Sequence, residues 1–239
     1  MKNTRIKRLV LIALGLVVGF FLLYPIVNTL VRYFTLLSIG VLWAYVLWLV
    51  WGNRRLRIGF LCFSLLLPAL LATNGREVPA AEFRMTYARA LIGYEGTPYV
   101  WGGENWLGID CSGLVRAAMI DTNLRLGLLS LSPQYLRKAF FIWFHDAGAD
   151  TLAAGFREQT RHVLKTPSLN DVDYARLAQG DVMVDSNGVH TMVYLGDRTW
   201  IEADPMQSKV IRVRVPSEIG WFKIPVSIVR WRQLDQQPG

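Results

Sequence analysis

Apolar and charged positions divide the chain into two parts. No charged residue occurs from Leu9 to Val31, nor from Tyr33 to Gly52. A helix of either length can cross a hydrocarbon core of about 30 Å at 1.5 Å per residue. A third apolar run, Ile58 to Ala72, is shorter and contains Pro68, so its length fits a short span, an interfacial helix or a buried helix. We predict a membrane anchor over residues 1–75, with transmembrane helices at 9–31, 34–52 and 58–74.

Helical spacing continues into the first half of residues 76–239. Phe83, Tyr87 and Leu91 recur at helical intervals after Pro79, which predicts a helix ending near Gly93. Turn residues in "GTPYVWGG" interrupt the pattern, and Asp110 can cap a second helix. Two further helices are predicted in a helical insertion at about 122–178, one from Ser132–Pro133 to before Gly148 and one over Leu152–Leu164.

The period then changes to two, which is typical of strands. "DVMVD" and "VHTMVYLG" read as a hairpin with its turn at Asn187–Gly188, and "TWIEA", "KVIRVRV" and "PVSIVRWRQ" read as later strands. Helices followed by antiparallel strands predict an α+β domain with the helices on one face of the sheet. The predicted fold is therefore two to three transmembrane helices followed by an α+β domain.

The formal net charge of +8 comes from the apolar part. Nine of the 26 basic residues and no acidic residue lie up to Arg76, which leaves 17 basic and 18 acidic residues for the remainder. The second part therefore has no basic excess for phosphates, and we expect no nucleic-acid partner.

The same charges predict a topology. One basic cluster precedes the first apolar run, the other follows the second run at Asn53–Arg57, and only Arg32 is charged between the two runs. Both clusters favour the cytoplasmic side. The second part then lies outside if the run 58–74 spans the membrane, and in the cytoplasm if it does not.

The chain has two cysteines. Cys62 lies in the third apolar run and reads as a small hydrophobic residue. Cys111 directly follows the predicted cap Asp110, where unpaired N–H groups and the helix dipole stabilise a thiolate and can also stabilise an oxyanion. A nucleophile and an inert buried thiol both fit this position. The cysteine spacing suits neither a disulfide framework nor a metal site, so we expect no metal and no cofactor.

A nucleophilic cysteine needs a base, and the chain has three histidines. His145 and His162 lie in predicted helices, where packing or exposure explains them. His190 lies on a predicted strand and shares a face with Met192 and Tyr194. On the next strand, Glu202 falls close to diagonal from His190, where a carboxylate could orient the imidazole.

Several motifs together resemble the NlpC family of papain-like cysteine peptidases. They are "TPYVWGGENWLGIDCSGLV", "QGDVMV", "VHTMVYLG" and "WIEA", and the resemblance covers roughly Phe83 to Arg232. It implies that Cys111 is the nucleophile, that His190 is the base and that Glu202 orients the base. Glu202 is a departure, because the family usually has His, Asn or Gln at this position.

The resemblance also implies supporting roles around the nucleophile. Tyr99 is expected to help to hold the oxyanion, while Asp110 and Ser112 match motif positions with a structural or supporting role. The residues expected to bind substrate are Trp101, Gly102, Gly103 and Trp106.

The implied substrate is the peptidoglycan stem peptide, at the bond between D-glutamate and the diamino acid in position three. The expected partners are then peptidoglycan or a muropeptide and the lipid bilayer, with no protein partner indicated. The expected location is a bacterial inner membrane, with the catalytic domain on the extracytoplasmic side.

Two alternatives remain open. The first is another papain-like activity, either a lipid acyltransferase or deacylase, which would suit a membrane-embedded enzyme, or an amidase on a non-wall substrate. The second is a non-catalytic membrane module that keeps the fold for binding. The aromatic stretch Phe140, Phe141, Trp143 and Phe144 reads either as core or as a surface that docks on the membrane.

Overall fold

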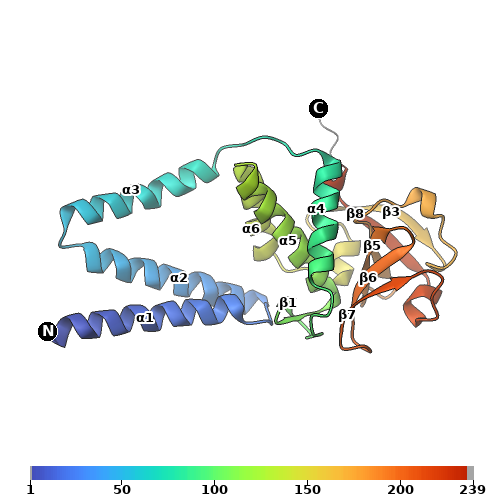
Figure 1. The fold of residues 1–239 in the computed structure, drawn as a ribbon, viewed down its shortest axis with the longest axis horizontal. Helices are drawn as coiled ribbons and strands as arrows, with labels where there is room; N and C mark the ends of the chain where they lie inside the picture. The colour runs from blue at the N-terminus through green and yellow to red at the C-terminus, as the bar shows by residue number, and fades with distance from the viewer. Residues whose placement is uncertain (1, 236–239) are drawn as a thin grey trace.

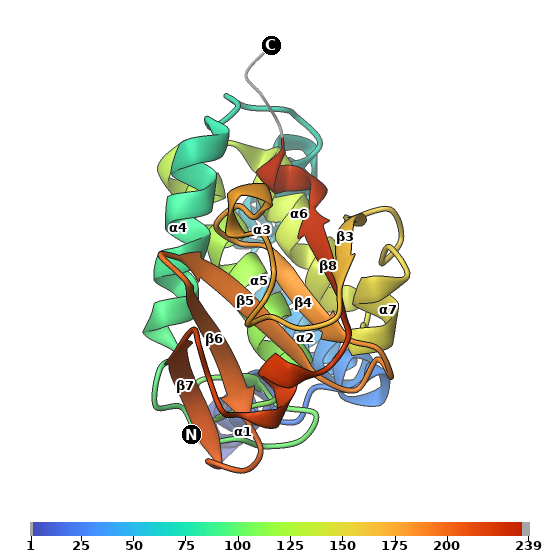
Figure 2. The ribbon, with the colours of Figure 1, turned by 90° about the vertical axis from the view of Figure 1, so that its right-hand side faces the viewer.

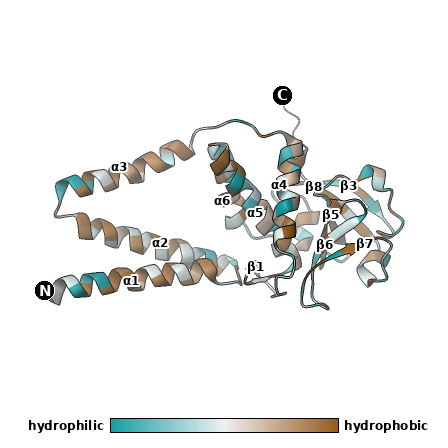
Figure 3. Ribbon diagram, in the orientation of Figure 1, coloured by the Kyte–Doolittle hydropathy of each residue, from teal (hydrophilic) through white to brown (hydrophobic). Residues whose placement is uncertain are grey.

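The computed structural model describes residues 2–235 and begins with three apolar helices (Figure 1). Helix α1 (Lys2–Leu23) and helix α2 (Thr29–Val50) lie side by side and antiparallel, and α3 (Arg54–Leu71) runs back toward the rest of the chain. Figure 3 shows these helices as mostly hydrophobic, with polar residues at the end where α1 begins and α2 meets α3. By length and composition, segments Thr4–Leu23 and Thr29–Val50 are candidate membrane spans.

The helix boundaries correct the predicted spans. The prediction of one helix over 9–31 is wrong, because α1 ends at Leu23 and a turn over residues 24–28 follows. Asn28 caps α2 by accepting a hydrogen bond from the Val31 backbone N at 3.0 Å. Arg32 therefore lies in the first turns of α2 and not between two helices. Absence of charge locates an apolar segment, whereas caps and Pro25 determine where its helices end.

The α+β domain follows α3, as the sequence predicts. Four helices are α4 (Ala80–Gly93), α5 (Cys111–Leu129), α6 (Pro133–Phe144) and α7 (Ala149–Ala153). A short ribbon, β1 (Glu104–Asn105) with β2 (Gly108–Ile109), lies just before α5. The six-stranded antiparallel sheet has the order β3–β8–β4–β5–β6–β7. Its strands are β3 (Thr160–Thr166), β4 (Val182–Asp185), β5 (Thr191–Gly196), β6 (Thr199–Asp204), β7 (Lys209–Arg214) and β8 (Val226–Trp231).

Helix α5 is the central helix of the domain. It packs against α4, α6 and strands β5 and β6, and Figure 2 shows it behind the sheet. Its buried Val115 and Met119 belong to the same apolar core as Val193 and Ile201 of the sheet. The alternate residues of these strands lie in a second apolar cluster, which contains Met183, Met192, Trp200, Phe222 and Ile228. Because both faces of the strands are buried, the ends of β5 and β6 are firmly placed next to the start of α5.

The predicted helix over Leu152–Leu164 is wrong. Helix α7 ends at Ala153, and the chain then forms β3, which pairs along its length with β8. The segment 122–178 is thus not purely helical, and His162 lies on a strand. Pairing with a strand some seventy residues later is a tertiary contact that overrides the local pattern.

The aromatic stretch of α6 divides between the two readings. Ile142 and Ala139 of this helix are fully buried, Phe141 packs partly against the core, and Phe140 is exposed. The face that α6 turns to the domain is therefore core, while Phe144 packs edge-on against Tyr33 of α2, with ring centroids 6.0 Å apart.

Candidate active site

Cys111 is the first residue of α5, and Asp110 caps that helix. The Asp110 Oδ1 atom accepts hydrogen bonds from Gly113 N at 2.6 Å and from the Ser112 hydroxyl at 3.1 Å. Its Oδ2 atom accepts from Gly102 N at 2.8 Å. Asp110 thus ties the start of α5 to the glycine pair.

The glycine pair lies directly against the first turn of α5, the helix that begins at Cys111. A Cβ atom on Gly113 would come within 2.0 Å of the Gly103 carbonyl oxygen, so only glycine allows this approach. Gly102 has a φ of +74°, which favours glycine. The packing explains the glycine of "DCSG", since Gly113 makes room for the "WGG" segment, whereas a Cβ atom on Gly103 would instead meet the backbone of Gly108 and Val100.

His190 and Glu202 form a buried pair next to Cys111. His190 directly precedes β5, Glu202 lies in β6, and His190 Nε2 is 2.6 Å from Glu202 Oε2. Both side chains are almost completely buried. On the other side, the Cys111 Sγ atom lies 3.7 Å from the Val189 carbonyl oxygen. The structure therefore brings the three predicted residues together.

Asp185 holds the turn that carries the histidine, and sequence reasoning missed it. The Asp185 Oδ1 atom accepts hydrogen bonds from the backbone N atoms of Val189 and His190, both at 2.7 Å. The side chain fixes the backbone on which the imidazole stands. The sequence offers one indication of this role: Asp185 ends "DVMVD", directly before the predicted turn.

The charges around His190 favour the imidazolium. Burial lowers the pKa of His190, but hydrogen bonds and negative charge from Cys111 and Glu202 outweigh burial and raise this pKa to about 9. Burial raises the pKa of Glu202. Because Glu202 occupies Nε2, the Nδ1 atom is the imidazole nitrogen left for the thiol. At neutral pH the imidazole of His190 is therefore charged and can interact with the Cys111 sulfur through Nδ1.

Tyr99 lies close to Cys111 and Asp110. Burial and the negative charges of Cys111 and Asp110 raise the pKa of Tyr99 to about 12. The phenol thus stays protonated at physiological pH and can donate a hydrogen bond to an oxyanion. Its backbone N donates to the Ser208 carbonyl at 2.9 Å, which fixes the residue to the loop between β6 and β7.

An apolar hollow of about 510 Å³ lies beside His190. The Trp221 ring stacks on the imidazole, with ring centroids 4.4 Å apart and planes 20° apart. The other residues of the hollow are Asp204, Met206, Gln207, Ile219, Gly220 and Ile224. Trp221 shields the His190–Glu202 hydrogen bond from water. The sequence carries no local signal for this contact, because Trp221 comes from a different loop.

The residues predicted to bind substrate do not all lie in one place. Trp101 is 81% exposed and lines a cavity of about 360 Å³ together with Gly102, Gly103, Ser112 and Gly113. Trp106 is 64% exposed and lines a different hollow, between α4 and α5. The structure thus brings Trp101 and the glycine pair to a cavity at the first turn of α5, but not Trp106.

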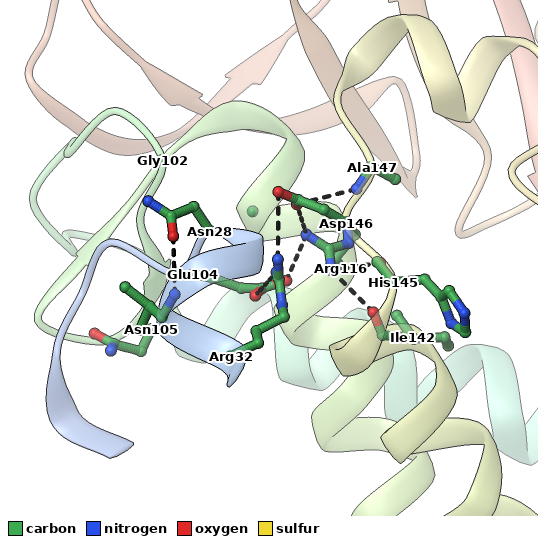
Figure 4. Close-up of polar contacts among 12 residues, drawn as sticks. Asn28, Arg32, Gly102, Glu104, Asn105, Arg116, Ile142, His145, Asp146 and Ala147 are labelled. Carbon is green, nitrogen blue, oxygen red and sulfur yellow. Dashed lines mark hydrogen bonds and ion pairs between the residues drawn. The ribbon is translucent and has the colours of Figure 1, made fainter. Parts of the chain in front are cut away.

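A group of charged residues joins α2, β1 and α5, and sequence reasoning missed it (Figure 4). Arg32 of α2 and Arg116 of α5 both contact Glu104 of β1, each at 2.8 Å. Asp146, after α6, contacts both arginines. Arg32 offered a signal, as the single charge between the two longest apolar runs.

Among residues 2–235, no group of three or more His, Cys, Asp or Glu side chains is arranged to hold a metal ion.

The comparisons with known proteins agree on one family. The family model described as "NlpC/P60 family" matches residues 96–230, which is more than half of the chain and includes Cys111, His190 and Glu202. The chain belongs to the NlpC/P60 family. Its helices and antiparallel sheet form an NlpC/P60 domain, and the three apolar helices precede the matched region. A search of curated proteins finds no match.

Several solved structures are similar to the chain. NlpC1 from Trichomonas vaginalis is 18% identical over 66% of this chain and 46% of its own, with a TM-score of 0.40. An NlpC/P60 family protein from Bacillus cereus is 17% identical over 60% of this chain and 40% of its own, with a TM-score of 0.38. The peptidoglycan hydrolase RipB from Mycobacterium tuberculosis is 21% identical over 62% of this chain and 65% of its own, with a TM-score of 0.39. The chain thus spans less than half of the length of the first two.

Proposed function

We propose that this NlpC/P60 protein is a membrane-anchored cysteine hydrolase that cleaves amide bonds in peptidoglycan stem peptides, as a D,L-endopeptidase. The observation that carries the proposal is the buried His190–Glu202 pair, at 2.6 Å, beside the thiol at the start of α5. A thiol kept only for packing would not need a charged imidazole oriented by a buried carboxylate.

The geometry supports a two-step acyl transfer. The Cys111 thiolate attacks the carbonyl carbon, and the oxyanion is held by N–H groups at the start of α5 and by the Tyr99 hydroxyl. The His190 imidazolium gives its proton to the leaving amine, which leaves a thioester on Cys111. The neutral imidazole then takes a proton from water as that water attacks the thioester. Hydrolysis releases the carboxylate product and restores the thiolate–imidazolium pair.

Incubation of the full-length protein in detergent with muropeptides tests the reaction. We expect mass spectrometry to find products that gain one water by cleavage between D-glutamate and the diamino acid. The same protein with Cys111→Ala serves as the blank. If muropeptides stay intact while phospholipids lose an acyl chain, the peptidase proposal is wrong.

The side of the membrane follows from where the hairpin meets the domain. The turn over residues 24–28 contacts the domain, with Val27 N donating to the Gly102 carbonyl at 2.9 Å. The basic clusters lie at the opposite ends of α1 and α2 (Figure 1). If those clusters are cytoplasmic, the domain is extracytoplasmic. We therefore place it on the outer face of a bacterial inner membrane.

This topology requires α3 to cross the membrane. At 18 residues, α3 is roughly 27 Å long, slightly less than a hydrocarbon core. Its far end is held at the domain, because Arg137 of α6 donates to the Thr73 carbonyl at 2.5 Å and to the Asn74 side chain at 2.6 Å. Arginines at its start can snorkel to the cytoplasmic headgroups.

Reporter fusions test the topology in a Gram-negative host. We expect alkaline phosphatase fused after Gly239 to be active, because that enzyme matures only outside the cytoplasm. The matched control is a fusion after Gly52, between α2 and α3, which should be inactive. An inactive fusion at Gly239 together with an active cytoplasmic fluorescent reporter there would put the domain in the cytoplasm.

A lipid acyltransferase or deacylase is the second candidate function. The hollow beside His190 favours it, because Met206, Ile219, Trp221 and Ile224 make that hollow largely apolar. In addition, Leu128 and Leu129 at the end of α5 and Leu131 in the turn before α6 are exposed, and α6 also exposes Phe140. Exposed apolar side chains of this kind suit contact with the lipid bilayer.

A further inference from the structure

We propose that residues 24–28 and Arg32 belong to the catalytic site and position Cys111. Residues 24–28 form the turn between the two longest apolar helices. The proposal rests on the proposed function, since it assigns a role in that same site. The hairpin formed by α1 and α2 would then position the catalytic residue as well as anchor the enzyme in the membrane.

The turn lies against the glycine pair as an added strand. Ile26 and Gly103 form an antiparallel bridge, Val27 N donates to Gly102 O at 2.9 Å, and Glu104 N donates to Pro25 O at 3.0 Å. Backbone hydrogen bonds of this kind fix the register of two segments far apart in the sequence.

The side chain of Asn105 extends the same contact. Its Nδ2 atom donates to the carbonyl oxygens of Tyr24 at 3.0 Å and Leu23 at 3.3 Å, at the end of α1. The last turn of the first helix, which would otherwise leave carbonyls unpaired, is thereby bonded to the domain.

The opposite edge of the same segment holds the nucleophile's helix. Gly103 O accepts from Asp110 N at 3.1 Å, and Gly102 N donates to the Asp110 side chain at 2.8 Å. Gly102–Glu104 is therefore clamped between the hairpin turn and the cap of α5. Displacement of residues 24–28 would therefore move Gly102–Glu104, and with it the start of α5 and Cys111.

Buried ion pairs also connect α2, β1 and α5. Arg32 is only 1% exposed and its Nη2 lies 2.8 Å from Glu104 Oε2, while Arg116 Nη1 lies 2.8 Å from Glu104 Oε1 (Figure 4). Arg116 stands five positions after Cys111 on α5, and its Nη2 donates to the carbonyls of Ile142 at 2.9 Å and His145 at 3.0 Å. Glu104 thus joins the hairpin to the helix of the nucleophile.

This arrangement is more than an anchor. A tether needs only a covalent link, which the chain already has through α3 and the segment before α4. An arginine buried near the end of a membrane helix is unfavourable unless it is paired, so its pairing inside the domain indicates a specific docked position. The turn also forms one wall of the 360 Å³ cavity, where Ile26, Val27 and Asn28 face Trp101 and Ser112.

The test compares variants of the full-length protein in detergent, all with Cys62→Ser so that Cys111 is the single thiol. Iodoacetamide alkylation of Cys111 reports the site without any substrate, and stem-peptide hydrolysis gives kcat and KM. For Arg32→Gln we expect alkylation at pH 7 to slow by about fivefold or more and kcat/KM to fall by about tenfold or more, because the clamp loosens. Arg32→Lys should recover part of both rates, since it keeps the charge. Arg55→Gln, an exposed arginine of α3, is the matched control and should leave both unchanged.

The outcomes separate the two proposals. A folded Arg32→Gln protein with the control's alkylation rate and kcat would overturn the positioning role, even if its unfolding temperature is lower. If Arg32→Gln fails to fold, Asn105→Ala takes its place. An unchanged alkylation rate in Asn105→Ala would likewise overturn the positioning role. Slower alkylation in these variants without stem-peptide cleavage by any protein would keep the positioning role and reject the proposed substrate.

Discussion

Replacing Cys111 with alanine is expected to abolish turnover while leaving the fold intact. The substitution removes the one atom that forms the acyl intermediate, and no described side chain beside it can take over. The loss in kcat should be roughly 10⁴–10⁶-fold, as for other nucleophiles that act together with a base. Binding of substrate should persist, because the oxyanion donors and the cavity walls remain.

The stability of the Cys111→Ala protein is expected to change by no more than about 1 kcal/mol, or roughly 2–4 °C in unfolding temperature. The thiol lies at the edge of the core and faces the Val189 carbonyl and His190, not the apolar cluster around Met119. Hydrolysis assays and thermal unfolding of the full-length protein measure the two effects separately.

Cys62→Ser is the matched control for that measurement. Cys62 is exposed on α3, far along the chain from the site, and its replacement should leave kcat unchanged. A Cys111→Ala protein that still turns over substrate within tenfold of the parent would show that the thiol is not the nucleophile. The non-catalytic membrane module would then become the better description.

The position of Cys111 at the start of a helix could be predicted from the sequence because its signal is local, the preceding cap Asp110. Alternation predicted His190 on a strand, whereas in the structure it directly precedes β5, which begins at Thr191. One hairpin separates His190 from Glu202, so strand geometry alone was enough to bring the two side chains near each other.

The contacts that span long separations could not be predicted this way. Arg32 reads as a loop charge until the fold brings Glu104 to it from 72 positions away. Strand β3 similarly depends on its pairing with β8, which overrides a weak helical pattern. Neither the stacking of Trp221 on His190 nor the hold of Asp185 on the turn leaves a periodic trace. These long-range contacts fix the orientation of the side chains in the candidate site.

Replacing His190 with alanine is expected to lower kcat/KM by about 10²–10⁴-fold and to remove the alkaline limit of the pH profile. The parent protein should keep its activity up to about pH 9 and lose it above, because the pKa of His190 is raised to about 9 and the imidazolium must donate to the leaving amine. Without the imidazole, alkylation of Cys111 should be slow at pH 7 and rise with pH as for an ordinary thiol.

The same pKa links His190 to stability. Its value is raised above the ordinary 6.5 of an unfolded chain, so the folded state binds the proton more tightly. The stabilisation from His190 is therefore fully present below about pH 6.5 and is lost as the pH rises toward about 9. Chemical denaturation of the parent between pH 6 and pH 10 should show this loss, and His190→Ala should not.

Glu202→Gln is the conservative variant that separates orientation from charge. Glutamine can still hydrogen-bond His190 Nε2, but it removes the negative charge that helps to raise the pKa of His190. We therefore expect a partial loss of about tenfold in kcat at pH 7 and an alkaline limit that moves to lower pH. Profiles of kcat and kcat/KM against pH measure both. An alkaline limit that stays at the parent's value would mean that Glu202 carries no charge in the working enzyme. In that case Cys111 and His190 act as a dyad, and the buried carboxyl serves only to hold the ring in place.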